Sequence, residues 1–136
     1  MTNLIDWAPN LSIGIQSFDT EHKKLVGYLN ELNSAMMAGS GKAACERILT
    51  GLISYTKTHF ANEERIFDLY HYPDAEAHKQ EHVNLIREVG SFYERFQRNE
   101  VALSVSLLQF LESWLKNHIQ VTDKKYGVFL NAKGLR

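Results

Sequence analysis

The feature of this sequence that most constrains its fold is a set of four apolar stripes, each of which carries at least one histidine. Within a stripe, apolar residues recur three and four positions apart, which places them on one face of an α-helix. The stripes cover residues 22–36, 48–70, 75–96 and 101–118. Four amphipathic helices joined by short connections predict an all-α, antiparallel up-down four-helix bundle.

Helix-starting and helix-stopping residues separate the stripes. Asp19 is the expected N-cap of the first helix, and the Gly-Ser-Gly segment at 39–41 ends it. Pro73 disfavours helical geometry before it and closes the second helix, so Asp74 is the expected N-cap of the third. His71, in this connection, is predicted to be a surface residue.

The chain is predicted to be one domain over residues 1–136. Residues 1–18 are expected to form an extended arm packed over one end of the bundle. Residues 19–130 would hold the bundle and, at 126–130, a short final helical turn. No repeat or linker divides the sequence.

Composition limits the partners and the cellular compartment that can be expected for this protein. The formal net charge of -1 gives no electrostatic basis for binding nucleic acid or an anionic membrane surface. No apolar run approaches the ~18 residues needed to span a bilayer, and residues 1–10 do not resemble a signal peptide. The single cysteine, Cys45, excludes an internal disulfide and is expected to pack as a small apolar residue. We therefore expect a cytoplasmic protein with no direct membrane contact.

Five histidines and two carboxylates are the candidate functional residues. Each predicted helix places a histidine on its apolar face, and burying so many polar groups without partners would cost roughly 1–3 kcal/mol per group. Metal coordination satisfies all of them together. Imidazole suits zinc, copper, iron and nickel, and seven ligands are too many for one tetrahedral zinc, so two neighbouring ions are expected. The candidate ligands are His22, His59, Glu63, His78, His82, His118 and Asp123.

A ferritin-like di-iron site is the main alternative in a helical bundle. Such sites need a Glu-x-x-His pair on each of two helices. None of the five histidines on the stripes has a glutamate three residues before it. The sequence therefore excludes the ferritin-like pattern.

Four motifs resemble those of the hemerythrin family, and in particular its bacterial branch, over nearly the whole chain. They are Asp-Thr-Glu-His at 19–22, His-Phe-Ala-Asn-Glu-Glu at 59–64, His-Lys-Gln-Glu-His at 78–82 and His-Ile-Gln-Val-Thr-Asp at 118–123. Trp7 also fits the family pattern. The resemblance implies a pair of iron ions with a bridging oxo or hydroxo group, and molecular oxygen as the ligand.

Carried over by position, the resemblance assigns His78, His82 and His118 to one iron, and His22 and His59 to the other. Glu63 and Asp123 would bridge both ions. The iron with two histidines would then keep one coordination position for oxygen. The resemblance also implies an apolar oxygen pocket, formed by Phe60, Trp114, Leu115 and Ile119.

The spacing of His118 and Asp123 does not suit a regular helix, because residues five apart point in different directions. We expect a local irregularity there, or a long side-chain reach. Glu64, beside a predicted ligand, is either a partner of the ligands or a solvated charge.

The role of oxygen binding stays open among three possibilities. Bacterial hemerythrin domains similar to this one occur at the cytoplasmic C-terminus of methyl-accepting chemotaxis receptors of the DcrH type. This similarity favours an oxygen- and redox-sensing domain in signal transduction, with a receptor domain upstream in the same polypeptide.

A stand-alone oxygen carrier or storage protein is the alternative. A peroxide or nitric oxide reductase is disfavoured, because no further inward acid or base accompanies the ligands, and the chain is not expected to be an enzyme. The oligomeric state is not predicted.

Overall fold

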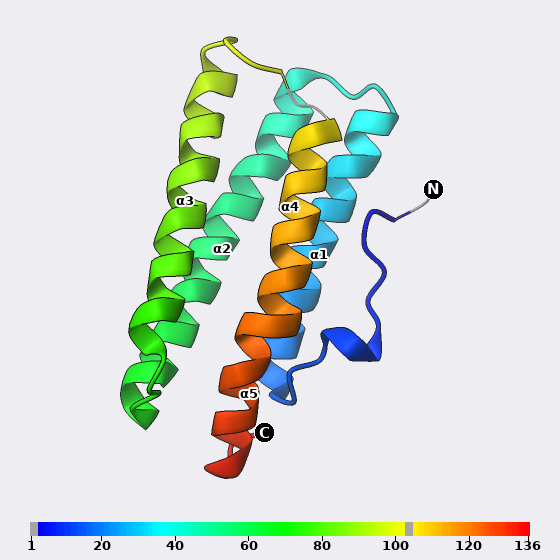
Figure 1. Ribbon diagram of the computed structural model, residues 1–136. Helices are drawn as coiled ribbons and strands as arrows, with labels where there is room; N and C mark the ends of the chain where they lie inside the picture. The colour runs from blue at the N-terminus through cyan, green and yellow to red at the C-terminus, as the bar shows by residue number, and fades with distance from the viewer. Residues whose placement is uncertain (1–2, 103–104) are drawn as a thin grey trace.

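The computed structural model describes residues 3–102 and 105–136, and within these residues it contains helices and no strand. Figure 1 shows long helical segments that lie side by side and alternate in direction along the chain. The elements are η1 (Pro9–Leu11), α1 (Gln16–Met37), α2 (Lys42–Tyr70), α3 (Ala75–Gln97), α4 (Val105–Asn117), η2 (His118–Asp123) and α5 (Lys124–Ala132). The predicted all-α four-helix bundle is confirmed.

The short connections follow the chemistry of their residues. Gly39 adopts a φ of +70° just after α1 ends, a conformation that glycine tolerates without strain. His71 ends α2 in the left-handed region with a φ of 55°, and Pro73 follows in the connection. His71 is exposed there, as predicted. Asp74 occupies the N-cap position of α3 but makes no side-chain capping hydrogen bond.

The first helix begins earlier than the sequence suggested. It starts at Gln16 rather than at Asp19, and Asp19 lies inside its first turn. The Asp19 carboxylate accepts hydrogen bonds from the Ile13 backbone N–H, at 2.8 Å, and from the Ser12 hydroxyl, at 2.6 Å. Asp19 therefore fixes the entry of the arm instead of capping the helix.

The end of the chain also differs from the prediction. Residues 126–130 are not a separate turn but part of α5, which continues α4 through the π-helix η2. Val101, which the predicted fourth stripe included, lies outside α4, and residues 103–104 fall outside the described residues.

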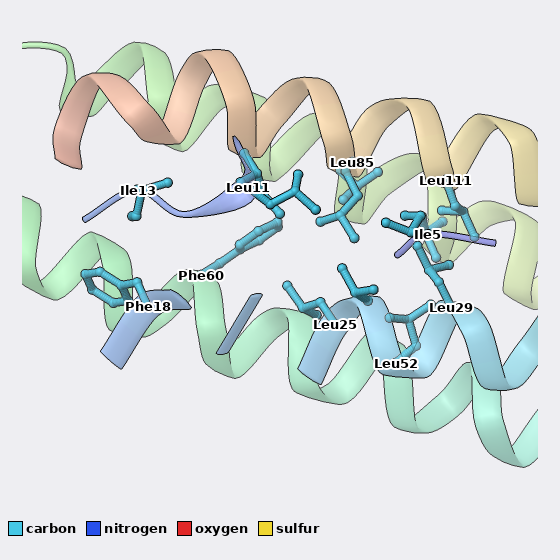
Figure 2. Packing of buried hydrophobic residues seen from close by; sticks show 14 of the residues in the cluster. Ile5, Leu11, Ile13, Phe18, Leu25, Leu29, Leu52, Phe60, Leu85 and Leu111 are labelled. Atoms are coloured by element: carbon cyan, nitrogen blue, oxygen red, sulfur yellow. The ribbon is translucent and has the colours of Figure 1, made fainter. Parts of the chain in front are cut away.

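The N-terminal arm does not cover one end of the bundle alone; it also covers part of its side. Asn30, well along α1, donates to the Ile5 carbonyl at 2.8 Å and accepts from the Ile5 N–H at 2.9 Å. The arm therefore runs along the side of the bundle before it enters α1 (Figure 1). Burial of apolar arm residues explains this course, because Ile5, Leu11 and Ile13 join the same core as the helices (Figure 2).

The core is continuous from the arm to the far end of the bundle. Leu29, Leu52 and Leu111 bring three different helices into one cluster of buried residues. Cys45 is buried in the same cluster, in agreement with its expected role as a small apolar residue. Among the described helices, none combines the length and the apolar character that a membrane crossing requires.

Candidate metal centre

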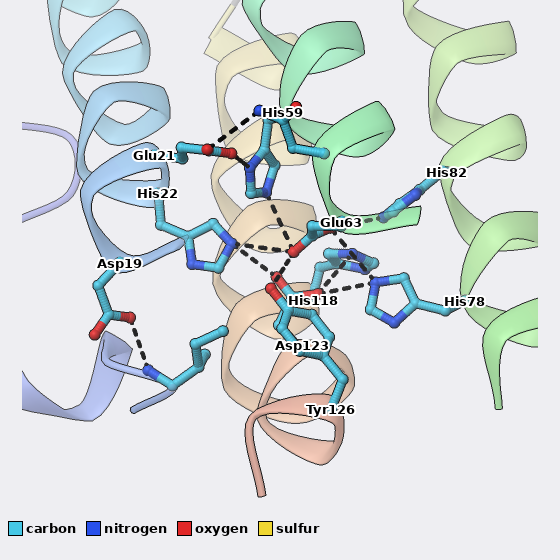
Figure 3. A network of polar contacts seen from close by, with 12 residues as sticks. Asp19, Glu21, His22, His59, Glu63, His78, His82, His118, Asp123 and Tyr126 are labelled. Atoms are coloured by element: carbon cyan, nitrogen blue, oxygen red, sulfur yellow. Dashed lines mark hydrogen bonds and ion pairs between the residues drawn. The ribbon is translucent and has the colours of Figure 1, made fainter. Parts of the chain in front are cut away.

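All seven predicted ligands lie together, facing one another across the interior of the bundle (Figure 3). Each is at most 3% exposed. They come from four helical segments: α1 provides His22, α2 provides His59 and Glu63, α3 provides His78 and His82, and η2 provides His118 and Asp123.

Two of the histidines form the first cluster, which we call the two-histidine cluster. Nε2 of His59 lies 3.3 Å from Oε2 of Glu63, and Nε2 of His22 lies 3.6 Å from the same oxygen. Oδ2 of Asp123 lies 3.1 Å from Nε2 of His22. These four side chains offer ligand atoms within 4.8 Å of one another.

The other three histidines form the second, three-histidine cluster around the opposite carboxylate oxygens. Oε1 of Glu63 lies 3.2 Å from Nε2 of His82 and 3.8 Å from Nε2 of His78. Oδ1 of Asp123 lies 3.0 Å from Nε2 of His78 and 3.1 Å from Nε2 of His118. Glu63 and Asp123 thus each give one oxygen to each cluster.

The π-helix explains how Asp123 reaches the centre. On an α-helix, residues five apart are separated by about 140° around the axis. The wider turn of η2 brings His118 and Asp123 to the same face, and both are buried. The expected local irregularity is therefore present.

The centre fits two metal ions because most of its inward atoms have no hydrogen-bond partner among the described residues. The buried atoms without a hydrogen bond include Nε2 of four of the histidines, Oε1 of Glu63 and both carboxylate oxygens of Asp123. Buried polar atoms in folded proteins are almost always satisfied. Imidazole nitrogens and carboxylate oxygens in two adjoining groups form a donor set suited to a pair of transition-metal ions.

Three glutamates hold the outer nitrogens of the ligands. Nδ1 of His59 lies 2.5 Å from Glu21, Nδ1 of His82 lies 2.9 Å from Glu64, and Nδ1 of His118 lies 3.2 Å from Glu81. A carboxylate in this position fixes the ring orientation and directs Nε2 to the metal. We refer to Glu21, Glu64 and Glu81 as the outer glutamates.

Sequence reasoning missed two of the outer glutamates and left Glu64 undecided. Each stands next to a predicted ligand in the sequence, but each binds a ligand of the following helical segment: Glu21 on α1 contacts His59 on α2, for example. Their adjacency to ligands was a usable signal. No signal in the sequence, however, indicated which histidine of another helical segment each glutamate would contact.

Tyr126 is a further contact that the sequence did not reveal. It is fully buried on α5, and its hydroxyl donates a hydrogen bond to Oε2 of Glu63. Burial raises the pKa of Tyr126 well above its usual value, and the neighbouring Glu63 charge adds to this, so the phenol stays protonated. Its position three residues after Asp123 was the available signal.

Opposing effects set the pKa values inside the centre. Burial lowers the pKa of His22, but its contacts with Asp123 and Glu63 outweigh burial and raise it to about 9. The same balance between burial and acidic neighbours raises the pKa of His59 and of His118 to about 9. Burial raises the pKa of the two carboxyl groups, and for Asp123 the Glu63 charge adds to this. Contacts with the histidines prevail, however, and hold both carboxyl pKa values well below the usual range. Both carboxylates are therefore ionised.

A small cavity adjoins the centre within the bundle. Its volume is about 40 Å³, and its wall includes Phe60, Trp114 and Leu115 of the predicted pocket. Ile119, the fourth predicted residue, is fully buried but does not line the cavity. The wall also contains apolar residues that the sequence did not single out: Leu25, Leu29, Leu52, Ile53, Leu85, Ile86, Val89 and Leu111.

Two aromatic residues of this wall stack on ligand rings. The rings of Phe60 and His82 are 3.6 Å apart and nearly parallel, at 4°. Those of Trp114 and His118 are 4.3 Å apart at 15°. These contacts hold the imidazole planes and keep water from their faces.

A four-helix bundle that buries five histidines around two shared carboxylates defines a non-haem protein with a paired metal centre. Residues 13–130 match the family described as Hemerythrin HHE cation binding domain, and the chain belongs to this family. Its similarity to hemerythrins, together with the two ligand clusters, identifies the cofactor as two iron ions and the chain as a hemerythrin-like, oxygen-binding protein.

The relatives agree in sequence and in fold. The chain is 35% identical to a bacteriohemerythrin of Stenotrophomonas maltophilia (strain R551-3) over 124 residues, which cover 91% of this chain and 80% of the relative. It is 31% identical to myohemerythrin-1 of Phascolopsis gouldii over 121 residues, covering 88% and 89%. A crystal structure of wild-type hemerythrin superposes with a TM-score of 0.85 at 29% identity, over 91% of this chain and 95% of that chain.

Proposed function

We propose that this chain binds molecular oxygen reversibly beside its two-histidine cluster, as an oxygen- and redox-sensing domain of a chemotaxis signalling protein. The observation that supports the binding position is the placement of the cavity. Both histidines of the two-histidine cluster, His22 and His59, line the cavity, whereas His118 is the one histidine of the three-histidine cluster that lines it. The two-histidine cluster has fewer protein ligands and therefore leaves room for an outside ligand.

When bound, the iron pair supplies the reversible electron transfer by which the hemerythrin family holds oxygen. The residues of this chain supply the surroundings. Glu63 and Asp123 hold the two positions together, and the apolar wall excludes water from the cavity. Thr56 lines the cavity as well, but its hydroxyl donates to the Leu52 carbonyl at 2.7 Å and so is already engaged.

The same wall gives no support for an enzymatic role. Apart from Thr56, the polar side chains of the wall are His22, His59, His118 and Asp123, all of which belong to the ligand clusters. None is left over to act as a general acid or base. The relatives named above are hemerythrins, which agrees with the prediction that the chain is not an enzyme.

The contact between the N-terminal arm and the centre supports a sensing role. The arm element η1 packs against η2, which carries His118 and Asp123. Ile13, near the end of the arm, lies directly on Gly127 of α5. A receptor domain upstream in the polypeptide would join the bundle through this arm, in the cytoplasm.

An oxygen carrier or storage protein is the second candidate. The observation in its favour is that the bacteriohemerythrin and myohemerythrin relatives align with this chain over 80% and 89% of their own lengths. Most of each relative is therefore accounted for by the hemerythrin domain itself.

Iron content and optical spectra test the oxygen-binding proposal. Anaerobically reduced protein should contain about two irons per chain and lack strong visible bands. Oxygen should produce charge-transfer bands that fade when oxygen is removed. A folded protein with one ion or none would refute the proposal.

Amide hydrogen exchange of the arm separates the two candidate roles. A sensor requires the exchange of residues 3–15 to differ between the reduced and the oxygenated protein. Equal exchange in both states, with reversible oxygen binding intact, would favour the carrier.

A further inference from the structure

Tyr126 stands at the base of the metal centre in a fixed position. Its ring packs at 5.6 Å from that of Phe18, at 5.0 Å from that of Phe67 and at 5.5 Å from that of His78. With the ring held on several sides, the hydroxyl has one direction available, towards Glu63 (Figure 3).

The hydrogen bond of Tyr126 goes to one particular oxygen of Glu63. That oxygen, Oε2, faces His22 and His59. The other oxygen, Oε1, faces His78 and His82 and receives no hydrogen bond from any residue that the structure describes. The donor is therefore confined to one half of a bridging ligand.

The outer glutamates add to the difference between the two halves. His82 and His118, in the three-histidine cluster, both have a glutamate at Nδ1. In the two-histidine cluster, only His59 has one. Among the described residues, Nδ1 of His22 and Nδ1 of His78 have no hydrogen-bond partner, so the three-histidine cluster has two glutamate-bound histidines and the two-histidine cluster has one. A carboxylate at Nδ1 strengthens donation by the ring, so the three-histidine cluster is the more electron-rich of the two.

We propose that Tyr126 makes the two iron positions electronically unequal, by drawing charge from the carboxylate oxygen that faces the two-histidine cluster. A hydrogen bond to an anionic ligand weakens its donation to the metal, and weaker donation favours the ferrous over the ferric state. Tyr126 is thus a positioning residue that keeps the oxygen-binding iron reduced. The inference rests on the di-iron centre and on the proposed oxygen binding.

The test is Tyr126→Phe, which removes the hydroxyl and keeps the ring. In the diferrous protein enriched in ⁵⁷Fe, one of the two Mössbauer doublets should shift while the other stays in place. Conversion to the ferric state in air should become about tenfold faster. The matched control is Tyr72→Phe, because Tyr72 packs on Phe67 and Phe129 in the same aromatic group. The control should leave both doublets unmoved and change the rate less than twofold.

A fluorinated tyrosine at position 126 gives the opposite change without loss of shape. Its more acidic phenol donates a stronger hydrogen bond, so conversion to the ferric state should become slower than in the native protein. A merely structural role of Tyr126 predicts no such ordering. Doublets that shift equally in Tyr126→Phe, or rates that do not follow the acidity of the donor, would overturn the inference. Failure of the native chain to load two irons or to bind oxygen would instead refute the proposed function.

Discussion

Each histidine whose Nδ1 meets an outer glutamate uses both of its ring nitrogens. Nε2 points into the centre, and Nδ1 is held by a carboxylate from the preceding helical segment. The carboxylate therefore decides which nitrogen is free to bind metal. His22 and His78 lack this second contact, since their Nδ1 atoms are buried without a hydrogen-bond partner in the described part of the chain.

Glu21→Ala should weaken metal binding by about 10- to 100-fold, because Nδ1 of His59 loses its acceptor. Competition with a chromophoric chelator for ferrous iron, under anaerobic conditions, measures this change. Glu31→Ala is the control, as Glu31 is an exposed glutamate on the same helix. Glu21→Gln keeps an acceptor oxygen and should recover part of the affinity. An affinity within twofold of the native value in Glu21→Ala would show that the contact has no positioning effect.

At this scale the sequence predicted the inner residues better than the outer ones. The spacing of four between His59 and Glu63, and between His78 and His82, determines that both members of a pair share a helix face. The contacts of Glu21 and Tyr126 depend instead on how neighbouring segments are rotated against each other, and no local pattern encodes that. The assignment of the seven residues as iron ligands remains a prediction, and so does the membership of Ile119 in the oxygen pocket.

Among the elements, η2 and the N-terminal arm are where the structure differs most from a regular helical bundle. The π-helix η2 carries His118 and Asp123 into the metal centre. The sequence predicted four helices from their periodicity, but its pattern became irregular between His118 and Asp123. The π-helix in this segment is the physical reason, because its period differs from that of an α-helix. The predicted helical start at Asp19 was wrong because the Asp19 side chain accepts hydrogen bonds from the arm and does not cap the helix.

Gly127→Ala should detach the arm from α5. A Cβ atom at Gly127 would lie 2.2 Å from the Ile13 carbonyl oxygen, so the backbone of the arm must move. We expect a loss of about 1–3 kcal/mol in the free energy of unfolding, measured by urea denaturation. Gly90→Ala, on α3, meets nothing within 4 Å and should stabilise by up to about 1 kcal/mol. Equal effects of the two substitutions would contradict the close packing of the arm.

For the whole molecule, the centre connects four helical segments through one set of buried polar groups. Removal of iron with a chelator should therefore lower the melting temperature by roughly 10 °C or more, since ions that bind the folded state alone stabilise it. Differential scanning calorimetry of loaded and chelated protein, with reloading as the control, measures the change. A melting temperature that does not depend on metal would mean that the clusters are satisfied without ions.

The stability of the chelated protein should fall as pH rises from about 6.5 to above 9. The pKa values of His22, His59 and His118 are raised from 6.5 to about 9 in the fold. Their contribution is thus fully present below 6.5 and is lost as pH passes through the raised values. The lowered carboxyl pKa values of Glu63 and Asp123 act in the opposite sense, so their contribution is lost at acidic pH below about 4.

Urea midpoints of the chelated protein between pH 5 and 10 test this expectation. The midpoint should be highest near pH 5–6.5 and decline on the alkaline side, by an amount on the order of a few kcal/mol in unfolding free energy. Metal affinity should change in the reverse direction, since ions compete with protons for the same imidazoles. A midpoint that rises towards pH 9 would contradict the assigned contacts.

The division of each bridging carboxylate between the two clusters has a consequence for the supply of iron. Glu63 and Asp123 each face both clusters, so an ion held in either cluster would fix these two carboxylates and prepare the ligands of the other position. Filling should then be cooperative, and molecules with a single ion should be a minor species. When iron is scarce, most chains in a cell would hold either no iron or two irons. The number of chains able to bind oxygen would then be about half the number of iron ions available to them.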